Sequence, residues 1–364
     1  MPRFLRTFAP LLILACTVLI ATAQPPKATT SKEPALGTYH WPNGTAGVDQ
    51  FATWLNRDTV WALDFVGTES WDSIGWPVWW LENWSKWVHA KPNRRLILSI
   101  PILPGPLDYS GPTDGQKGRG VTVSLEQGAK GEYNQHFKDL AENLVRYKMT
   151  STIIRPAWEF NGNWYTWQAK GKTKAFIEYW QQIVKTMRAV PGCEKLEFCW
   201  NPTSGYQQFP ADEAWPGDDY VDYVGVDVYD ETWLEGTYPW PANSTPEEIE
   251  KRRQKAWDGF IMNDHRGLTF YTQFAKDHHK PLAIPEWGVC ESKHNHGGLD
   301  NAYFIKKMHE FIMNPDNNVA FHCYFDVNTP SINHQLSPGP AKSDQPEGTR
   351  HPNSSKLFRE LFSK

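Results

Sequence analysis

The stretch Thr152-Ile-Ile-Arg-Pro-Ala-Trp-Glu-Phe-Asn-Gly-Asn-Trp-Tyr-Thr-Trp167 carries a short apolar run directly into charged, polar and aromatic residues. The run is typical of a buried strand, and Glu159 stands where the strand ends. The stretch Pro281-Leu-Ala-Ile-Pro-Glu-Trp-Gly288 repeats this design with Glu286. Because parallel strands that are buried on both faces expose side chains mainly at their ends, we expect both carboxyls at one working surface.

Six more runs of the same kind lie along the chain, and helical patterns separate several of them. Apolar residues recur three and four positions apart over Phe137–Val145, Phe176–Met187 and Phe304–Ile312, which is the spacing of one buried helix face. The predicted strands are Leu36–Trp41, Thr59–Val66, Arg95–Leu103, Ser151–Glu159, Leu196–Asn201, Tyr223–Tyr229, Leu282–Trp287 and Val319–Phe325.

Eight apolar strands alternating with amphipathic helices favour an α/β fold with a parallel sheet covered by helices. Eight is the number at which such a sheet closes, so we predict a single (β/α)8 TIM barrel. The competing fold is an open doubly wound sheet, but no glycine-rich phosphate loop follows the first strand.

The first 23 residues have the features of a secretory signal peptide. Two arginines precede an apolar run, and Ala21-Thr-Ala23 offers a small-residue cleavage site. We therefore expect a signal peptide over 1–23, a flexible tether over 24–35 and the catalytic barrel over 36–364. The expected location is secreted, either extracellular or periplasmic.

The charge balance argues against a polyanionic partner. The whole chain carries −4, and removal of the two arginines of segment 1–23 leaves −6. With no basic run for nucleic acid and no second segment long enough for a membrane span, we expect a neutral substrate and a monomer.

The cysteines and histidines do not have the spacing of a metal site. Cys193, Cys199, Cys290 and Cys323 permit disulfides in an oxidising compartment, but their spacing leaves the pairing open. We predict no metal and no cofactor.

Aromatic side chains are unusually frequent, with 19 tryptophans in the chain. Most are expected in the core. The cluster from Trp71 to Trp87 is too dense for full burial, however, and flat indole faces suit the apolar faces of pyranose rings. This pattern is suggestive of a sugar-binding surface.

Two carboxyls at the ends of the fourth and seventh strands lie opposite each other across the mouth of an eight-stranded ring. Side chains from different strands converge only at the carboxyl end of such a barrel. Glycoside cleavage needs one carboxyl to protonate the leaving oxygen and another to attack or to activate water. Glu159 and Glu286 are therefore the candidate catalytic pair.

Other residues at strand ends are candidates for substrate binding or for orienting the pair. Asp227 and Tyr229 lie two apart on one strand and so share a face. Arg155 is interpreted either as a carboxylate partner or as support for its strand. The full set of predicted substrate-binding residues is His40, Trp41, Arg155, Trp158, Asn161, Trp164, Trp200, Asn201, Asp227, Tyr229, Trp287 and Asp326.

Four motifs make the chain resemble glycoside hydrolase family 26, a family of retaining barrel glycosidases. They are Arg155-Pro-Ala-Trp-Glu-Phe-Asn-Gly-Asn-Trp164, Trp200-Asn-Pro202, Trp215–Tyr229 and Pro285-Glu-Trp-Gly288. The resemblance implies a (β/α)8 barrel, Glu159 as acid/base, Glu286 as nucleophile and a hydrogen bond from Tyr229 to that nucleophile. It also implies endo action on a polysaccharide, with β-1,4-mannan leading and mixed-linkage β-glucan or β-1,3-xylan as alternatives.

One departure from the family pattern bears on the choice of sugar. The pattern has a histidine before the acid/base glutamate, whereas this chain has Trp158. An indole offers one donor and a ring face, whereas an imidazole donates or accepts.

Two hypotheses from other classes stand beside the glycosidase. One is a catalytically silent carbohydrate-binding barrel, against which the pair of glutamates argues. The other is a metal-dependent deacetylase or esterase, for which the sequence has neither a ligand cluster nor a Gly-x-Ser-x-Gly motif.

Overall fold

The computed structural model describes residues 33–40, 44–75, 78–105, 117–118, 121–205, 207, 209–329, 331–338 and 350–363. These residues belong to one compact unit, Glu33–Lys364. The expected signal peptide, the tether up to residue 32 and Trp41 lie outside the described residues.

Eight parallel strands close into a barrel. Neighbouring strands follow the order β12-β1-β2-β3-β6-β7-β8-β10, and β10 pairs with β12 to complete the ring. The short β9 continues the line of β8 and pairs with the end of β10. The prediction of a closed (β/α)8 barrel is therefore confirmed. The barrel strands are β1 (Ala35–Tyr39), β2 (Trp61–Phe65), β3 (Leu96–Ile100), β6 (Ile153–Pro156), β7 (Glu197–Trp200), β8 (Tyr223–Gly225), β9 (Val228–Tyr229), β10 (Leu282–Gly288) and β12 (Val319–Phe325).

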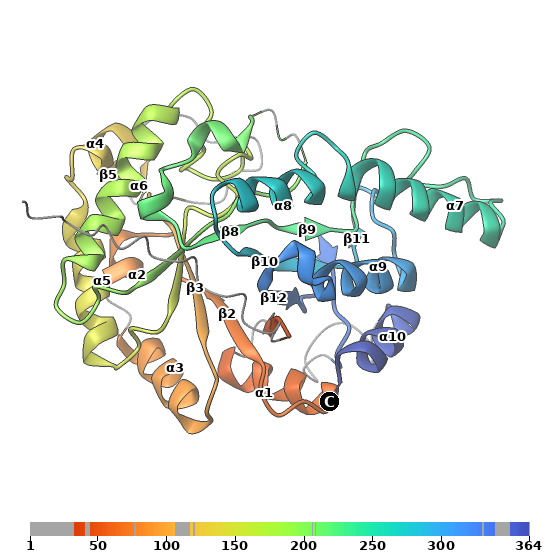
Figure 1. The fold of residues 1–364 in the computed structure, drawn as a ribbon, viewed down its shortest axis with the longest axis horizontal. Coiled ribbons are helices and arrows are strands. Elements are labelled where there is room, and N and C mark those ends of the chain that lie inside the picture. The colour runs from red at the N-terminus through yellow and green to blue at the C-terminus, as the bar shows by residue number, and fades with distance from the viewer. Residues whose placement is uncertain are drawn as a thin grey trace, which may run out of the picture. The chain divides into compact units, whose positions relative to one another are not determined.

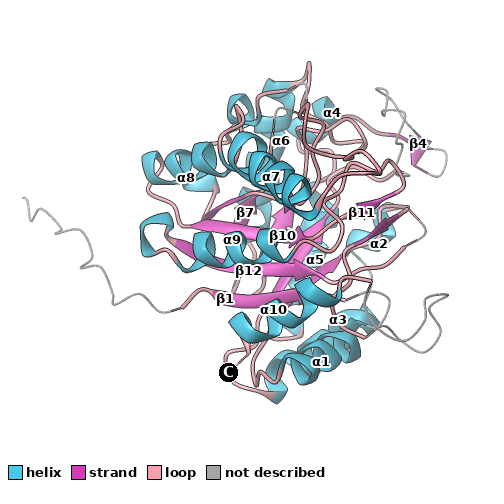
Figure 2. Cartoon of the chain, turned by 90° about the vertical axis from the view of Figure 1, so that its right-hand side faces the viewer, coloured by secondary structure: helices cyan, strands magenta, loops and turns pink. Residues whose placement is uncertain are grey.

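Helices surround the barrel (Figure 1) and Figure 2 shows β1, β12, β10 and β7 side by side inside them. Two helices that the sequence pattern did not predict, α1 and α3, connect the first three strands. The helices are α1 (Gly44–Leu55), α2 (Trp71–Gly75), α3 (Val78–Ala90), α4 (Leu125–Ala129), α5 (Asn134–Arg146), α6 (Thr173–Arg188), α7 (Pro246–Ala256), α8 (Leu268–Asp277), α9 (Ala302–Met313) and α10 (Pro352–Phe362).

Short elements lie in the connections. A π-helical turn follows α7, two-residue strands form two small antiparallel pairs, and 3-10 turns lie in other connections. They are the π-helix Trp257–Met262, the strands β4 (Lys117–Gly118), β5 (Val121–Thr122), β11 (Glu291–Ser292) and β13 (Ile332–Asn333), and the 3-10 turns Ala211–Ala214, Asp218–Tyr220 and Pro315–Asn317. No helix in the described part of the chain has the length and apolar character needed to cross a membrane.

Alternate strand residues face two different cores, which fixes where the site residues point. One set fills the barrel interior, and the other packs against the helices. The interior is so tight that a Cβ at Gly37 would lie 2.5 Å from Cys323 Sγ. The interior core consists of Leu63, Ile97, Ile153, Cys199, Ala283, Phe321 and Cys323.

The tryptophan cluster from Trp71 to Trp87 is largely structural where it is described. Trp84 and Trp87 are 3% and 5% exposed, and their indoles donate to Asp64 and Asp49. Trp71 stacks on His136 of α5. These residues join α3 and α2 to their neighbours, whereas Trp76 lies outside the described residues. The interpretation of the cluster as a sugar-binding surface stays a prediction.

All four described cysteines are free and buried. Cys199 and Cys323 line the barrel interior, where they act as small apolar side chains. The pairing that the sequence left open is therefore absent in the described part of the chain.

Candidate active site

Glu159 lies in a strained turn directly after β6. Ala157 and Glu159 have φ values of 49° and 52°, in the left-handed region that residues with a Cβ seldom adopt. The turn is held on both sides, because Ala157 N donates to Ile100 O at 3.0 Å and Glu159 N donates to Asn201 O at 2.8 Å. The neighbouring strands β3 and β7 thus fix the backbone that carries the carboxyl.

Glu286 reaches the site through an irregularity in β10. Ala283 faces the barrel interior, while Ile284 and Trp287 both face the helices. The register of β10 against β12 shifts between Ile284 and Trp287. Such an extra residue re-aims the side chains around it, and here it turns the Glu286 carboxyl toward the mouth.

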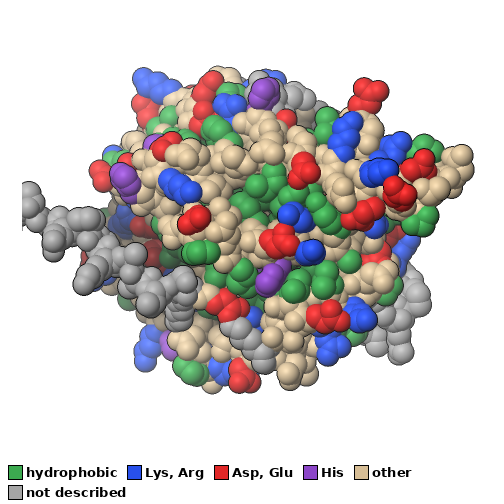
Figure 3. Space-filling view, turned by 45° about the vertical axis from the view of Figure 1, so that its right-hand side comes forward, with side chains coloured by type: hydrophobic (Ala, Val, Ile, Leu, Met, Phe, Trp, Pro, Cys, Tyr) green, Lys and Arg blue, Asp and Glu red, His purple; other side chains and the backbone are tan. Residues whose placement is uncertain are grey.

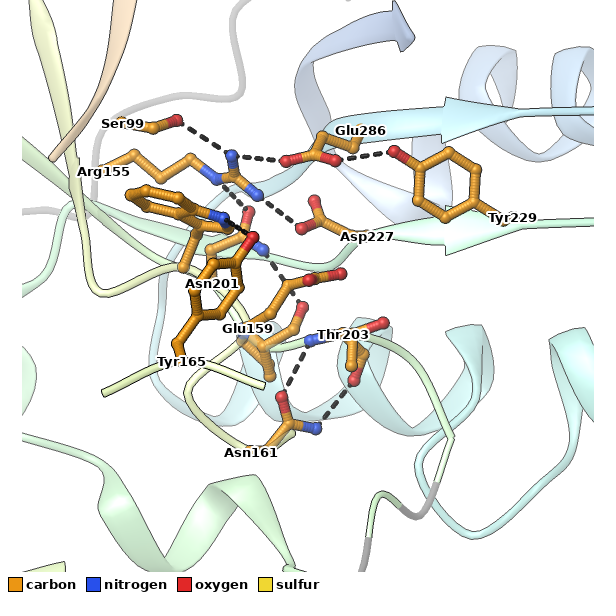
Figure 4. Close-up of polar contacts among 12 residues, drawn as sticks. Ser99, Arg155, Glu159, Asn161, Tyr165, Asn201, Thr203, Asp227, Tyr229 and Glu286 are labelled. Carbon is orange, nitrogen blue, oxygen red and sulfur yellow. Dashed lines mark hydrogen bonds and ion pairs between the residues drawn. The ribbon is translucent and has the colours of Figure 1, made fainter. Parts of the chain in front are cut away.

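Arg155 is the centre of a buried polar network (Figure 4). Its side chain is fully buried two positions after Ile153 on the same face of β6. Nη1 donates to Ser99 Oγ at 2.9 Å and pairs with Glu286 Oε1 at 2.7 Å, while Nε donates to Asn201 Oδ1 at 3.1 Å. Nη2 donates to Asp227 Oδ2. Both interpretations of Arg155 therefore apply, since it binds a carboxylate and ties four strands together.

The charges around Arg155 depend on one another. Burial alone would lower the pKa of this guanidinium, but the charges of Asp227 and Glu286 raise it above its ordinary value. Burial raises the pKa of Asp227 well above its usual range, against the Arg155 charge, which lowers it. A charge buried this deeply is stabilised only while its partners remain.

Tyr229 donates its hydroxyl to Glu286 Oε2 at 2.6 Å, which is the hydrogen bond that the resemblance implied. Its ring stacks on His334. The two oxygens of Glu286 thus differ in their contacts, since Oε1 forms an ion pair with Arg155 and Oε2 accepts the hydrogen bond from Tyr229. Each oxygen keeps a second lone-pair site.

The environment of Glu159 is different from that of Glu286. Burial raises the pKa of Glu159 to about 7, and the negative charge of Glu286 adds to this effect. Arg155 and the hydrogen bond from Trp164 act in the opposite direction. Trp164 Nε1 donates to Glu159 Oε2 at 2.9 Å. Glu159 therefore holds a proton up to about neutral pH.

Gly162 permits this contact. A Cβ at position 162 would collide with the six-membered ring of Trp164. The Asn-Gly-Asn-Trp turn thus lets the indole lie over its own backbone and reach the carboxyl three residues before the glycine.

The side chains of the two asparagines predicted to bind substrate form hydrogen bonds with other residues of the protein. Asn161 brackets Thr203, accepting from its N–H and donating to its carbonyl, both at 2.9 Å. Asn201 accepts from Arg155 and donates to Pro202 O. Both side chains hold the loop after β7 beside the turn after β6.

Three predicted tryptophans are buried. Trp200 is fully buried and packs on Phe160, Trp215 and Phe274. Trp287 is also fully buried and faces the helical layer through Phe304 and Phe358. The prediction that these two bind sugar does not fit their position, because neither presents a ring face to the mouth.

Trp158, the third, lies behind the site. It is 4% exposed, contacts Phe65 edge-on, and donates its N–H to Tyr165 Oη at 2.7 Å.

His40 and Asp326 form a buried pair at the first and last strands. His40 Nε2 lies 3.5 Å from Asp326 Oδ2. Asp326 accepts from the backbone N–H of Leu336 at 2.7 Å and of Ser337 at 3.2 Å, and also from the Ser337 hydroxyl. Asp326 therefore anchors the segment after β13.

Three further residues at the site, Ser99, Thr203 and Tyr165, were not predicted from the sequence. Ser99 lies two positions after Ile97 on β3, so strand periodicity would have placed it on the interior face. Tyr165 was visible as one of the aromatic residues that crowd the turn after Glu159. No signal in the sequence indicates the contact with Thr203. Within the described residues, no group of three His, Cys, Asp or Glu side chains is arranged to hold a metal ion.

The arrangement joins Glu159, whose pKa is raised by burial to about 7, with Glu286, which contacts Arg155 through one oxygen and Tyr229 through the other. Two titratable groups whose surroundings separate their protonation states are the usual basis of acid and nucleophile roles. Seven of the predicted residues take part in this network: Arg155, Glu159, Trp164, Asn201, Asp227, Tyr229 and Glu286.

Comparison with protein families gives a match over part of the chain. Residues 112–239 match the family model described as Glycosyl hydrolase family 26. The chain is 29% identical over 120 residues to a mannan endo-1,4-beta-mannosidase of Bifidobacterium adolescentis, covering 30% of this chain and 12% of the relative. It is 27% identical over 99 residues to a mannan endo-1,4-beta-mannosidase of Bacillus subtilis, covering 25% of this chain and 27% of the relative. The matched segments therefore span less than a third of either relative.

Solved structures share the fold over most of the chain. A Cellulomonas fimi endo-beta-1,4-mannanase double mutant has a TM-score of 0.59 at 15% identity, over 91% of this chain and 71% of that one. GH26C from Muricauda sp. MAR_2010_75 has a TM-score of 0.57 at 17% identity, over 91% and 86% of the two chains. The catalytic domain of a Bacillus sp. JAMB-750 GH26 endo-beta-1,4-mannanase has a TM-score of 0.59 at 15% identity, over 92% and 87%.

Proposed function

We propose that this chain, whose residues 112–239 match the family model described as Glycosyl hydrolase family 26, is a retaining endo-β-glycosidase that cleaves a neutral polysaccharide, with β-1,4-mannan as the leading substrate. The observation that carries the proposal is the unequal pair of carboxyls. Glu159 has a pKa raised to about 7, and Glu286 is held by Arg155 and Tyr229.

In the proposed first step, an oxygen of Glu286 attacks the anomeric carbon. The bond from that carbon to the leaving oxygen breaks, and Glu159 gives its proton to that oxygen. The Glu286 carboxylate loses its charge as the ester forms. Its loss removes a like charge near Glu159, so the pKa of Glu159 falls as the second step begins.

In the proposed second step, Glu159 accepts a proton from water while that water attacks the anomeric carbon. The ester bond to Glu286 breaks and the carboxylate is restored. Both glutamates return to their starting protonation states, and the configuration at the anomeric carbon is retained.

A neutral polymer suits the surface as well as the site. Figure 3 shows one face on which Lys and Arg side chains are interspersed with Asp and Glu side chains around a central group of hydrophobic ones. We also propose that the protein is secreted, as the N-terminal sequence predicts, and that it acts as a monomer.

Mannan leads because both curated relatives carry the name of mannan endo-1,4-beta-mannosidases. The observation that favours the alternatives is Trp158, which stands where the family pattern has a histidine. Its N–H donates to Tyr165, so it does not offer a sugar the contacts that an imidazole would offer. Mixed-linkage β-glucan and β-1,3-xylan are therefore the other substrates to test.

The test is product profiling of the purified protein on mannan, mixed-linkage glucan and β-1,3-xylan. The proposal expects reducing ends and mixed short oligosaccharides from one of the three. E159A and E286A provide the controls and are expected to lose almost all activity, since each removes one half of the double displacement.

Two outcomes would favour other classes. Binding to a polysaccharide without any release of reducing ends would indicate the silent carbohydrate-binding barrel. Activity that a chelator abolishes would indicate the metal-dependent deacetylase or esterase.

A further inference from the structure

Tyr165 has a hydroxyl proton for which the described part of the chain offers no acceptor. Its hydroxyl accepts the indole N–H of Trp158 at 2.7 Å, and this is its one hydrogen bond within the described part of the chain. A phenol that accepts one hydrogen bond still carries its own O–H donor. That donor is therefore available for water or for a molecule bound in the site.

The ring of Tyr165 is fixed in position. It stacks on Trp167 with centroids 4.4 Å apart and an interplanar angle of 9°. It also meets Trp158 edge-on at 5.0 Å. Trp158 and Trp167 are buried, whereas Tyr165 is half-buried, so Tyr165 is the member of this cluster that retains exposed surface.

The hydroxyl lies close to the reacting groups. In Figure 4 it points toward the centre of the polar network rather than away from it. Burial raises the pKa of Tyr165 well above its usual range, and the charges of Glu159 and Glu286 raise it further. Tyr165 thus keeps its proton and lies within electrostatic range of both carboxyls.

We propose that Tyr165 donates its hydroxyl proton to an oxygen of the sugar bound between Glu159 and Glu286, and that Trp158 sets the direction of this bond. The proposal rests on the proposed glycosidase function and deepens it. Because the indole N–H occupies a lone pair of the phenol oxygen, the phenol acts toward substrate as a donor. Trp158 is then a positioning residue, and Tyr165 is the residue that contacts the sugar.

This scheme gives a function to Trp158, which stands where the family pattern has a histidine. An imidazole in that place would itself donate or accept, whereas the buried indole passes the contact on to the neighbouring phenol. A site with a fixed donor prefers substrates that present an oxygen there, because an analogue that lacks the oxygen leaves the donor unpaired.

The experiment compares wild type with Y165F on an aryl β-glycoside of the sugar identified by product profiling, and on its single-deoxy analogues. On the parent glycoside, Y165F is expected to lower kcat/KM by about 2- to 13-fold, the effect of one neutral hydrogen bond. On the one deoxy analogue that lacks the accepting oxygen, wild type and Y165F are expected to have equal kcat/KM, since neither enzyme can form the hydrogen bond.

A second variant tests the orienting role. W158F keeps an aromatic ring but removes the N–H, and the double variant W158F/Y165F is expected to lose no more activity than Y165F alone. Y223F is the matched control, because Tyr223 donates to Glu197 outside the site at 2.9 Å, and its kcat/KM is expected to stay at the wild-type value. Thermal unfolding of each variant confirms that it is folded, and if W158F does not fold, the deoxy comparison alone decides.

An active wild type with an unaffected Y165F would overturn the inference and leave the proposed function intact. The inference would also be overturned if Y165F lost the same factor in kcat/KM, relative to wild type, on every deoxy analogue. Losses in W158F/Y165F equal to the sum of the two single-variant losses in free energy would overturn it as well. A wild type that hydrolyses none of the parent glycosides would overturn the proposed function and this inference with it.

Discussion

Replacing Trp164 by Phe tests the account of Glu159 most sharply. The change removes the N–H that donates to Glu159 Oε2 at 2.9 Å and keeps an aromatic ring in the turn. A donor to a carboxylate favours its charged form, so its loss raises the pKa of Glu159 above its present value of about 7.

The size of the shift follows from the strength of the lost bond. A hydrogen bond to a charged group contributes about 1.5–3 kcal/mol, which corresponds to about 1–2 pKa units. Because Trp164 is half-buried, water replaces part of the lost donor, and we expect the low end, about 1 unit.

The assay is the pH dependence of kcat/KM, which reports the pKa of the essential acid in the free enzyme. The acid must be protonated, so activity falls as the pH rises through the pKa of Glu159. In wild type this fall is expected at about pH 7, and in W164F about 1 unit higher.

Two further variants support the interpretation. W215F makes the same change at an indole that donates to Asp218 at 3.0 Å outside the site, and its alkaline limb is expected to match wild type. G162A displaces the Trp164 ring without changing its chemistry and is expected to shift the limb in the same direction as W164F. An alkaline limb of W164F that stays in place or moves to lower pH would refute the reasoning.

Three other predictions concern the network and the fold. Y229F is expected to lower kcat by about 10- to 150-fold, since it removes a bond of about 1.5–3 kcal/mol to Glu286, and steady-state kinetics with unchanged kcat would contradict this. D227A leaves the buried Arg155 charge short of a partner and is expected to cost about 3–5 kcal/mol in urea unfolding, whereas a loss below about 1 kcal/mol would count against the network. A reducing agent is expected to leave the melting temperature unchanged because the four described cysteines are free, and a marked fall would show that a disulfide exists.

The barrel was predictable because its strands are nearly continuous apolar runs. The carboxyl pair was predictable because each glutamate ends such a run. Asp227 and Tyr229 both reach the polar network, as their spacing of two predicted, although Asp227 lies between β8 and β9. Strand periodicity therefore gave the correct relation between these two residues.

The sequence did not reveal which face of a strand points inward. Both faces of a barrel strand are apolar, so Trp200 and Asn201 were equally good candidates until Cys199 was seen inside the barrel. At β10 the register shift turns Glu286 inward and leaves Trp287 outside, an irregularity that alternation does not predict.

The unpredicted helices have a different cause. Helix α1 contains glycine and threonine, and α3 is dense in tryptophan, which are poor helix formers. Both form because one side of each is buried in the core, and α3 gains two hydrogen bonds, from Trp84 to Asp64 of β2 and from Trp87 to Asp49 of α1. Tertiary contacts outweigh local preference in these segments.

The most direct test of the central claim is to locate the covalent intermediate. A 2-deoxy-2-fluoro glycosyl fluoride of the preferred sugar reacts with a retaining enzyme and leaves the sugar attached to the nucleophile. Mass spectrometry of a proteolytic digest is expected to place that added mass on Glu286, and E286Q is expected to remain unlabelled. A label on another residue, or an active enzyme that is never labelled and releases product of inverted configuration, would contradict the account.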